Sequence, residues 1–198
     1  MPNLVHYHSL NGVPRRPYDA ARLLRELEAQ FRLSRDPRER AILADWIVPE
    51  YVTYSNPEAA ANILAEVPDS NDPESNARIS ALRAEVRAMQ GLDPEPYIAA
   101  ALDLLPEIPE GVVALIRHRA GVAYFFARQP HAAEEQSLHA LWLSDAGGLR
   151  RLASRTASVL YAVHYHLTGD LQAARYYAEV ATVEGAAAGD DKFRRQFL

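Results

Sequence analysis

The segment 120–141, AGVAYFFARQPHAAEEQSLHAL, aligns without a gap with the segment 161–182, YAVHYHLTGDLQAARYYAEVAT, which lies 41 residues further along the chain. Similar segments at a fixed offset are the sequence signature of a repeat architecture. Four pairs of positions define the alignment, one small, one aromatic and two alanine: Gly121 with Ala162, Tyr124 with Tyr165, Ala133 with Ala174, and Ala140 with Ala181.

Each of these segments has the residue pattern of a helical hairpin. A small residue on the first helix lets the second helix approach, and alanines seven positions apart on the second helix let the backbones cross closely. The aromatic residue then fills the wedge between the two helices. The pattern therefore predicts that Tyr124 and Tyr165 are both buried.

The ends of further helices can be read along the whole chain. An Asp or Asn side chain accepts the unpaired amide hydrogens of a first turn, and a proline at the next position loses no useful donor. Glycines that can adopt the left-handed conformation mark helix ends at Gly91, Gly169 and Gly189. The predicted starts are Asp36-Pro37, Asn56-Pro57, Asp72-Pro73 and Asp93-Pro94.

Between these marks the apolar residues recur at helical spacing, and no convincing alternating strand is found. The chain is therefore predicted to be all-α. Pro49 is expected to kink or divide the second helix, because proline lacks an amide donor and clashes with the preceding turn. The predicted helices cover residues 18–32, 38–54, 57–67, 73–90, 94–105, 111–128, 131–145, 149–168 and 170–188, and a last helix opens at Asp190.

The repeated hairpin resembles the tetratricopeptide repeat. In that family the first helix carries a small residue and an aromatic three positions later, as at Gly121 and Tyr124. The second helix carries two small residues seven apart, as at Ala133 and Ala140. The resemblance implies tandem antiparallel hairpins that form a right-handed superhelix of about 9–10 helices. It is best over residues 114–148 and 149–189.

The repeat also departs from this family. It is longer than the usual length of about 34 residues, and glycines stand where the family has a proline after the second helix. Such longer repeats are similar to the helical sensor regions of large bacterial transcription regulators. Because the linkers are short and the composition is uniform, we expect an N-terminal extension over residues 1–16 and a single repeat domain over residues 17–198.

Composition narrows the possible functions. The 198 residues include no cysteine, which removes disulfides and thiolate chemistry and fits a reducing cytoplasm. A net charge of −5 disfavours direct nucleic-acid binding. No apolar run is long enough for a membrane span, and the chain shows neither a nucleophile elbow nor a phosphate-binding loop. We therefore expect a cytoplasmic, non-enzymatic protein without a cofactor.

The first helices of the hairpins are expected to line a concave binding groove. In that groove His118 and Arg119 could take a carboxylate of a ligand, and Phe125 and the valines could take its apolar side chains. The alternative is that the apolar members are packing residues between repeats. The candidate groove residues are His118, Arg119, Val122, Phe125, Thr156, Val159, Val163 and His166.

Several histidines raise the question of a metal site. The motif VHYH occurs at residues 5–8 and again at residues 163–166. Residues two apart on a helix differ by roughly 200 degrees, so His164 and His166 should point to opposite sides. His6 and His8 lie on one side if their segment is extended, but no third ligand is apparent. The stripe of His131, Glu135 and His139 is expected to be a solvated outer face, so no metal site is predicted.

The sequence favours a binding domain that recognises a peptide, a protein or a small effector, as the regulatory part of a bacterial transcription regulator. Its DNA-binding domain would lie outside this chain. One alternative is a free-standing adaptor that scaffolds an assembly, and another is a histidine-dependent metal protein. The helix that opens at Asp190 ends before a partner helix could cover Phe193 and Phe197, which suggests a longer parent protein or a homodimer through this end.

Overall fold

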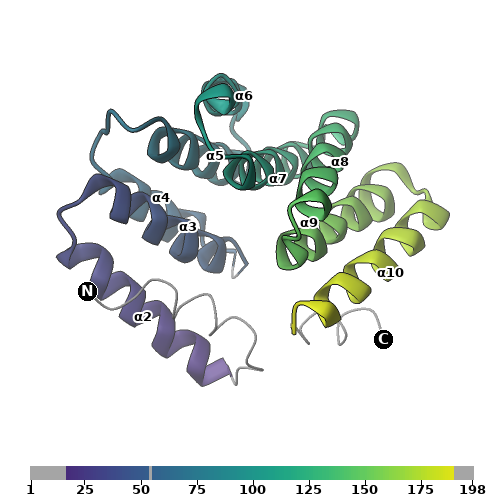
Figure 1. The fold of residues 1–198 in the computed structure, drawn as a ribbon, viewed down its shortest axis with the longest axis horizontal. Coiled ribbons are helices and arrows are strands. Elements are labelled where there is room, and N and C mark those ends of the chain that lie inside the picture. Colours follow the sequence, from purple (N-terminus) through teal and green to yellow (C-terminus); the bar gives the residue numbers. More distant parts are fainter. Residues whose placement is uncertain (1–16, 54, 190–198) are drawn as a thin grey trace.

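The computed structural model describes residues 17–53 and 55–189, and all regular secondary structure in these ranges is helical, as predicted (Figure 1). A short 3-10 turn, η1 (Leu105–Glu107), follows α6 (Glu95–Leu102). A π-helical turn, η2 (Val163–Thr168), continues α9 (Arg150–Ala162). The predicted helix at Asp190 lies outside the described residues. The helices are α2 (Pro17–Leu33), α3 (Pro37–Thr53), α4 (Pro57–Ala65), α5 (Pro73–Met89), α6 (Glu95–Leu102), α7 (Glu110–Phe126), α8 (Pro130–Ala146), α9 (Arg150–Ala162) and α10 (Leu171–Ala187).

The helices pack mainly in sequential pairs, which is consistent with helical hairpins. Within the described part of the chain the pairs are α3 with α4, α5 with α6, α7 with α8, and α9 with α10. The first helices of successive pairs also contact one another, α3 with α5, α5 with α7 and α7 with α9. Figure 1 shows the result as an arch, with α2 and α3 in one arm, α5 and α7 across the top, and α9 and α10 in the other arm.

The predicted helix starts at Asn56 and Asp72 and the predicted glycine helix ends are confirmed by their backbone and capping geometry, whereas the helix predicted to start at Asp93 is capped at Pro94 without a side-chain hydrogen bond. The side chain of Asn56 accepts a hydrogen bond from the amide of Ala59 at 3.1 Å, and Asp72 accepts one from the amide of Ser75 at 3.0 Å. Gly91, Gly169 and Gly189 all have positive φ angles, which a residue with a side chain rarely adopts. These caps satisfy backbone groups that would otherwise be unpaired at the helix ends.

Pro49 does not divide its helix, since α3 runs without a break from Pro37 to Thr53. The neighbouring side chains of Ile47 and Val48 are fully buried, and their burial holds the helix on the core past the proline. The hydroxyl of Thr53 also donates to the carbonyl of Pro49 at 2.8 Å. Tertiary packing therefore outweighs the local penalty that the sequence predicts at this position.

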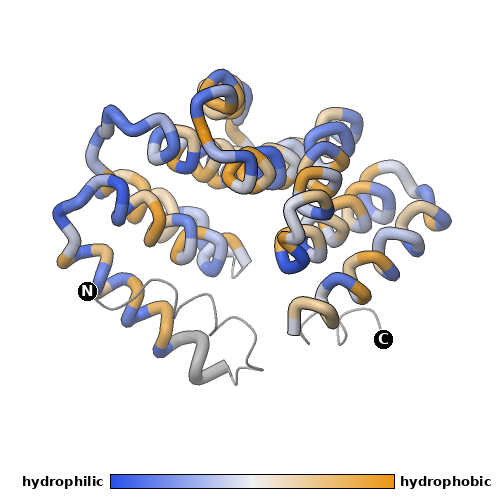
Figure 2. Tube along the Cα trace, in the orientation of Figure 1, coloured by the Kyte–Doolittle hydropathy of each residue, from blue (hydrophilic) through white to orange (hydrophobic). Residues whose placement is uncertain are grey.

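The two halves of the arch are packed differently. Between α2 and α5 the core is built from large apolar side chains, among them Phe31, Leu43 and Ile47. From α7 onward the buried positions are mostly alanine, serine and threonine, so the helices lie close together. Along the helices of both halves, apolar and polar residues alternate at short intervals (Figure 2). No helix in the described ranges combines the length and apolar character that a bilayer-spanning segment needs.

The first copy of the repeated hairpin packs as the sequence predicts. Tyr124 is only 7% exposed, and its hydroxyl donates to Glu95 at 2.9 Å. Burial and this carboxylate raise the pKa of the Tyr124 hydroxyl. Gly121 faces Ser137 on α8, and a Cβ atom built on Gly121 would lie 3.3 Å from the carbonyl oxygen of Ala133. The predicted close approach of α7 and α8 is confirmed.

The prediction for Tyr165 is wrong, because this ring is 49% exposed. Its segment forms the π-helical turn η2, which widens the helix locally and changes the direction of the residues in that turn. His164 takes the interior position instead, and its ring stacks on Tyr177 with centroids 5.4 Å apart. His166 is exposed, so the two histidines do diverge. The alanines of this copy, Ala174 and Ala181, are buried as predicted.

The close approach at Gly121 can be tested by the substitution Gly121→Ala. The new methyl group would clash with the Ser137 hydroxyl and press on the Ala133 carbonyl. We expect the free energy of unfolding to fall by about 1–2 kcal/mol, although alanine alone would stabilise the helix by about 1 kcal/mol. Urea unfolding followed by circular dichroism measures the change.

Gly111→Ala is the matched control, because the nearest atom to a Cβ at Gly111 is Leu149 Cδ1 at an ordinary 3.7 Å. We expect it to be neutral or to stabilise α7 by up to about 1 kcal/mol. Adding Ser137→Ala to Gly121→Ala should restore part of the lost stability. Equal effects of the two glycine substitutions would contradict a tight contact at Gly121.

Candidate binding surface

The predicted groove residues come from α7, from α9 and from the π-helical turn, and the structure brings members of the two repeats together. His118 Nδ1 on α7 lies 3.1 Å from Thr156 Oγ1 on α9. The rings of Phe125 and His166 are 6.4 Å apart between centroids. Val159 packs against the same buried cluster as Phe125. The α7–α9 contact therefore passes through these residues.

These residues differ strongly in exposure, which separates packing residues from surface residues. Arg119, Thr156 and Val163 are buried, and His118, Val122, Phe125 and Val159 are half-buried. His166 is exposed. That this set binds a ligand stays a prediction, but only part of it faces solvent.

Arg119 lies in a buried ion network that joins three helices. Its Nη1 donates to Glu85 Oε2 on α5 at 3.0 Å. Its Nη2 lies 2.9 Å from Asp45 Oδ1 on α3 and donates to the Asp45 carbonyl at 3.1 Å. Asp45 also pairs with Arg78. Burial raises the pKa of the Glu85 carboxyl, and Arg119 opposes that rise. The charge of Arg119 is thus already compensated within this chain.

His118 is held as a neutral ring beside this network. The Thr156 hydroxyl donates its single hydrogen to the Leu152 carbonyl at 2.8 Å, so His118 Nδ1 is the donor toward Thr156. Burial, together with the positive charges of Arg119 and Arg155, lowers the pKa of His118 to about 3. A neutral His118 fixes α7 against α9 through this hydrogen bond.

A row of five contacting rings lies at the end of α7 and along the last turns of α9 and η2, and we call it the aromatic strip. Consecutive ring centroids are 4.9–6.4 Å apart. Phe126, Tyr165 and His166 are exposed, and the other two are half-buried. In order of contact the strip consists of Phe126, Phe125, His166, Tyr165 and Tyr161.

Sequence reasoning found only Phe125 and His166 of this strip. It missed Tyr165 because the repeat register assigned that ring to the interior. Tyr161 and Tyr165 are four residues apart, so they share one helix face and could have been recognised as a pair. Exposed rings offer stacking faces to peptide groups, prolines and guanidinium groups, and a rigid aromatic side chain loses little entropy on binding.

A second exposed apolar patch lies on α8. Trp142 is 68% exposed, and Leu138 lies one turn before it on the same helix. His131, Glu135 and His139 are exposed on this helix, as predicted. In the described ranges no three potential metal ligands come together. His6, His8, Phe193 and Phe197 lie outside the described residues.

Comparisons of this chain with protein-family models, with curated proteins and with solved structures found no match. The class that the structure supports is an all-helical domain whose helices pack in sequential pairs.

The ion network can be tested with Arg119→Met. This change removes the ion-pair partner of the buried Glu85 carboxylate and leaves Asp45 with Arg78 alone, and breaking such a buried pair typically costs about 3–5 kcal/mol. We expect a loss of that size in the free energy of unfolding, measured by urea titration. Arg175→Met removes an exposed ion pair with Glu179 and should change stability by no more than about 0.5 kcal/mol. Similar values for the two variants would refute a structural role of Arg119.

The neutral state of His118 predicts a pH dependence of stability. The pKa of His118 is about 3 in the folded chain and 6.5 ordinarily, so below pH 6.5 the unfolded chain binds a proton that the folded chain does not. Stability is therefore present above pH 6.5 and is lost as the pH falls toward 3. We expect wild type to lose roughly 2 kcal/mol more than His118→Gln between pH 6.5 and 4.5.

Glutamine at this position keeps an N–H donor for Thr156, so the comparison isolates the titration of the ring. The exposed His131→Gln variant is the control and should follow the wild-type curve. Parallel curves for wild type and His118→Gln would show that His118 is protonated equally in the folded and unfolded states.

Proposed function

We propose that this chain is a non-enzymatic, tetratricopeptide-like binding domain that holds a peptide or protein segment on its aromatic strip. The observation that carries the proposal is the exposure of Phe126, Tyr165 and His166 within a continuous row of contacting rings. Aromatic side chains in such a row are typical anchors of protein interfaces. The rings of the aromatic strip can hold a partner by stacking, and none of them forms a catalytic constellation with a nucleophile.

The strip is also held rigidly, which favours specific binding. Phe125 packs on the buried α7–α9 cluster, and Tyr161 stacks on Tyr165. Behind them the His118–Thr156 hydrogen bond ties the two helices together. A surface that is already ordered loses little entropy when a partner docks. π-helical turns such as η2 occur frequently at functional sites.

Within this proposal the domain is the regulatory part of a bacterial transcription regulator, and its DNA-binding domain lies outside this chain. One support is that the repeat is longer than the usual tetratricopeptide repeat, as in such regulators. The other is the net charge of −5, which leaves contact with DNA to another domain. A free-standing adaptor is the second candidate. The exposed patch of Leu138 and Trp142 favours it, because a scaffold needs a second surface.

A peptide-display selection on the folded protein tests the binding surface. Peptides enriched on wild type should bind Tyr165→Ser at least about 10-fold more weakly, which corresponds to about 1.4 kcal/mol. Tyr165 is half exposed, so its replacement should leave the melting temperature nearly unchanged. Binding constants are measured by fluorescence anisotropy with labelled peptides.

Trp142→Ser is the matched control, because it removes an even more exposed aromatic ring from another helix. We expect it to bind the selected peptides like wild type. Weaker binding by Trp142→Ser together with normal binding by Tyr165→Ser would reject the aromatic strip and support the adaptor surface on α8.

A further inference from the structure

Arg83 is a cation that the described part of the chain does not compensate. It lies half-buried on α5, and it makes no hydrogen bond or ion pair with any described residue. The other arginines of its helix are engaged. Arg78 pairs with Asp45 and Glu74, and Arg87 donates to the Asp93 carbonyl at 3.1 Å. A half-buried guanidinium group without an acidic partner is able to bind an anion.

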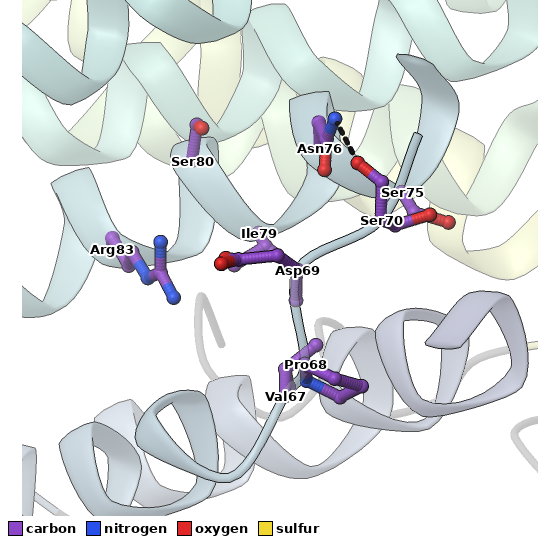
Figure 3. Close-up of a pocket in the computed structure, with 9 residues that line it drawn as sticks. All are labelled: Val67, Pro68, Asp69, Ser70, Ser75, Asn76, Ile79, Ser80 and Arg83. Atoms are coloured by element: carbon purple, nitrogen blue, oxygen red, sulfur yellow. Dashed lines mark hydrogen bonds between the residues drawn. The ribbon is translucent and has the colours of Figure 1, made fainter. Parts of the chain in front are cut away.

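Two small cavities meet at this side chain. The first has a volume of about 90 Å³ and is largely polar, and Ser80 and Arg83 both line it from α5, with the Ser80 hydroxyl lying apart from the Arg83 guanidinium (Figure 3). Asn76 and Ser75 also line this cavity, but they are occupied. Asn76 donates to the Ser70 carbonyl at 2.8 Å, and Ser75 donates to Asp72 at 2.6 Å. Arg83 is therefore the charged donor of this cavity, and no described residue engages it.

The second cavity, of about 190 Å³, is also lined by Arg83 and is mainly apolar. Ala61 and Leu64 of α4, Val86 of α5 and Tyr97 of α6 form its walls. The Arg87 guanidinium covers the Tyr97 ring at 5.5 Å from the centroid, so a second positive charge borders this cavity. The lining thus places an apolar recess beside the guanidinium groups of Arg83 and Arg87.

Size limits what can occupy these cavities. Pockets that enclose a whole drug-sized ligand usually measure about 300–1,000 Å³, and each of these is smaller. Each cavity holds one functional group, so the bound molecule must extend beyond the site. A carboxylate joined to one apolar side chain fits both cavities at once, and the last residue of a polypeptide has this structure.

We propose that the α4–α5–α6 face binds the C-terminal residue of a partner polypeptide. The terminal carboxylate accepts hydrogen bonds from Arg83, and an aliphatic side chain enters the cavity beside Leu64 and Tyr97. Asp69 is the one acidic residue that lines either cavity, and it is exposed. Its carboxylate lies on the Arg83 side of the first cavity and competes with the ligand (Figure 3). None of these helices contributes to the aromatic strip.

The test titrates the full chain with the peptide N-acetyl-Gly-Gly-Gly-Leu and follows backbone amide shifts by NMR. We expect shifts in α4 and α5 with a dissociation constant of about 1 mM or below. The C-terminally amidated peptide should bind at least about 10-fold more weakly, because it lacks the charge that Arg83 recognises. N-acetyl-leucine carries the same carboxylate without the peptide and should bind more weakly than the tetrapeptide.

Variants identify the residues that act in this site. Arg83→Gln should reduce affinity about 10-fold, and Asp69→Asn should increase it by removing the competing charge. Arg175→Gln on α10 is the control for loss of an exposed arginine and should bind like wild type. The proposal would be overturned if the tetrapeptide and its C-terminal amide bind equally, or if Arg83→Gln binds the tetrapeptide like wild type. It would also be overturned if N-acetyl-leucine binds as tightly as the tetrapeptide, or if up to about 10 mM tetrapeptide causes no shifts.

Discussion

The guanidinium group of Arg119 holds together helices that are far apart in the sequence. It extends from α7 past α5 to α3, where it contacts both the carboxylate and the backbone carbonyl of Asp45, 74 residues away. In a helical solenoid each repeat normally contacts only its neighbours. A link that passes over one helix therefore limits changes in the curvature of the arch. Because the network is buried, losing one partner would leave an uncompensated charge in the interior.

The close packing of the C-terminal half explains why aromatic rings gather at its surface. Gly121, Ala133 and Ala140 bring α7 and α8 into near backbone contact, and Ala174 and Ala181 do the same for α10 against α9. Little volume remains between these helices for large side chains. Tyr124 is accommodated in the first hairpin, whereas in the second the interior position holds His164, and Tyr165 lies in the aromatic strip. The candidate binding surface thus follows from the same tight contacts that stabilise the fold.

The candidate site was less predictable than the helices that carry it. Phe125 and His166 could be placed on one surface because each repeat assigns them to the same face. Arg119 and His118 could not be assessed from the sequence, because their burial depends on Asp45, Glu85 and Thr156 from other helices. Arg83 gave no signal, since whether any described residue pairs with it depends on how the surrounding helices fold together. Tyr165 was misplaced because a gapless alignment assumes one helical pitch, and η2 changes that pitch.

By itself the sequence determined the all-helical class, the positions of the helix ends and the small residues at the hairpin contacts. These features depend on interactions within one helix or between adjacent helices, such as the caps at Asn56 and Asp72. Tertiary structure alone decided that α3 continues through Pro49 and that His164 is buried while Tyr165 is exposed. It also decided that Arg119 has ion-pair partners among the described residues while Arg83 has none there. The physical reason is that burial and charge compensation depend on neighbours brought together only by folding.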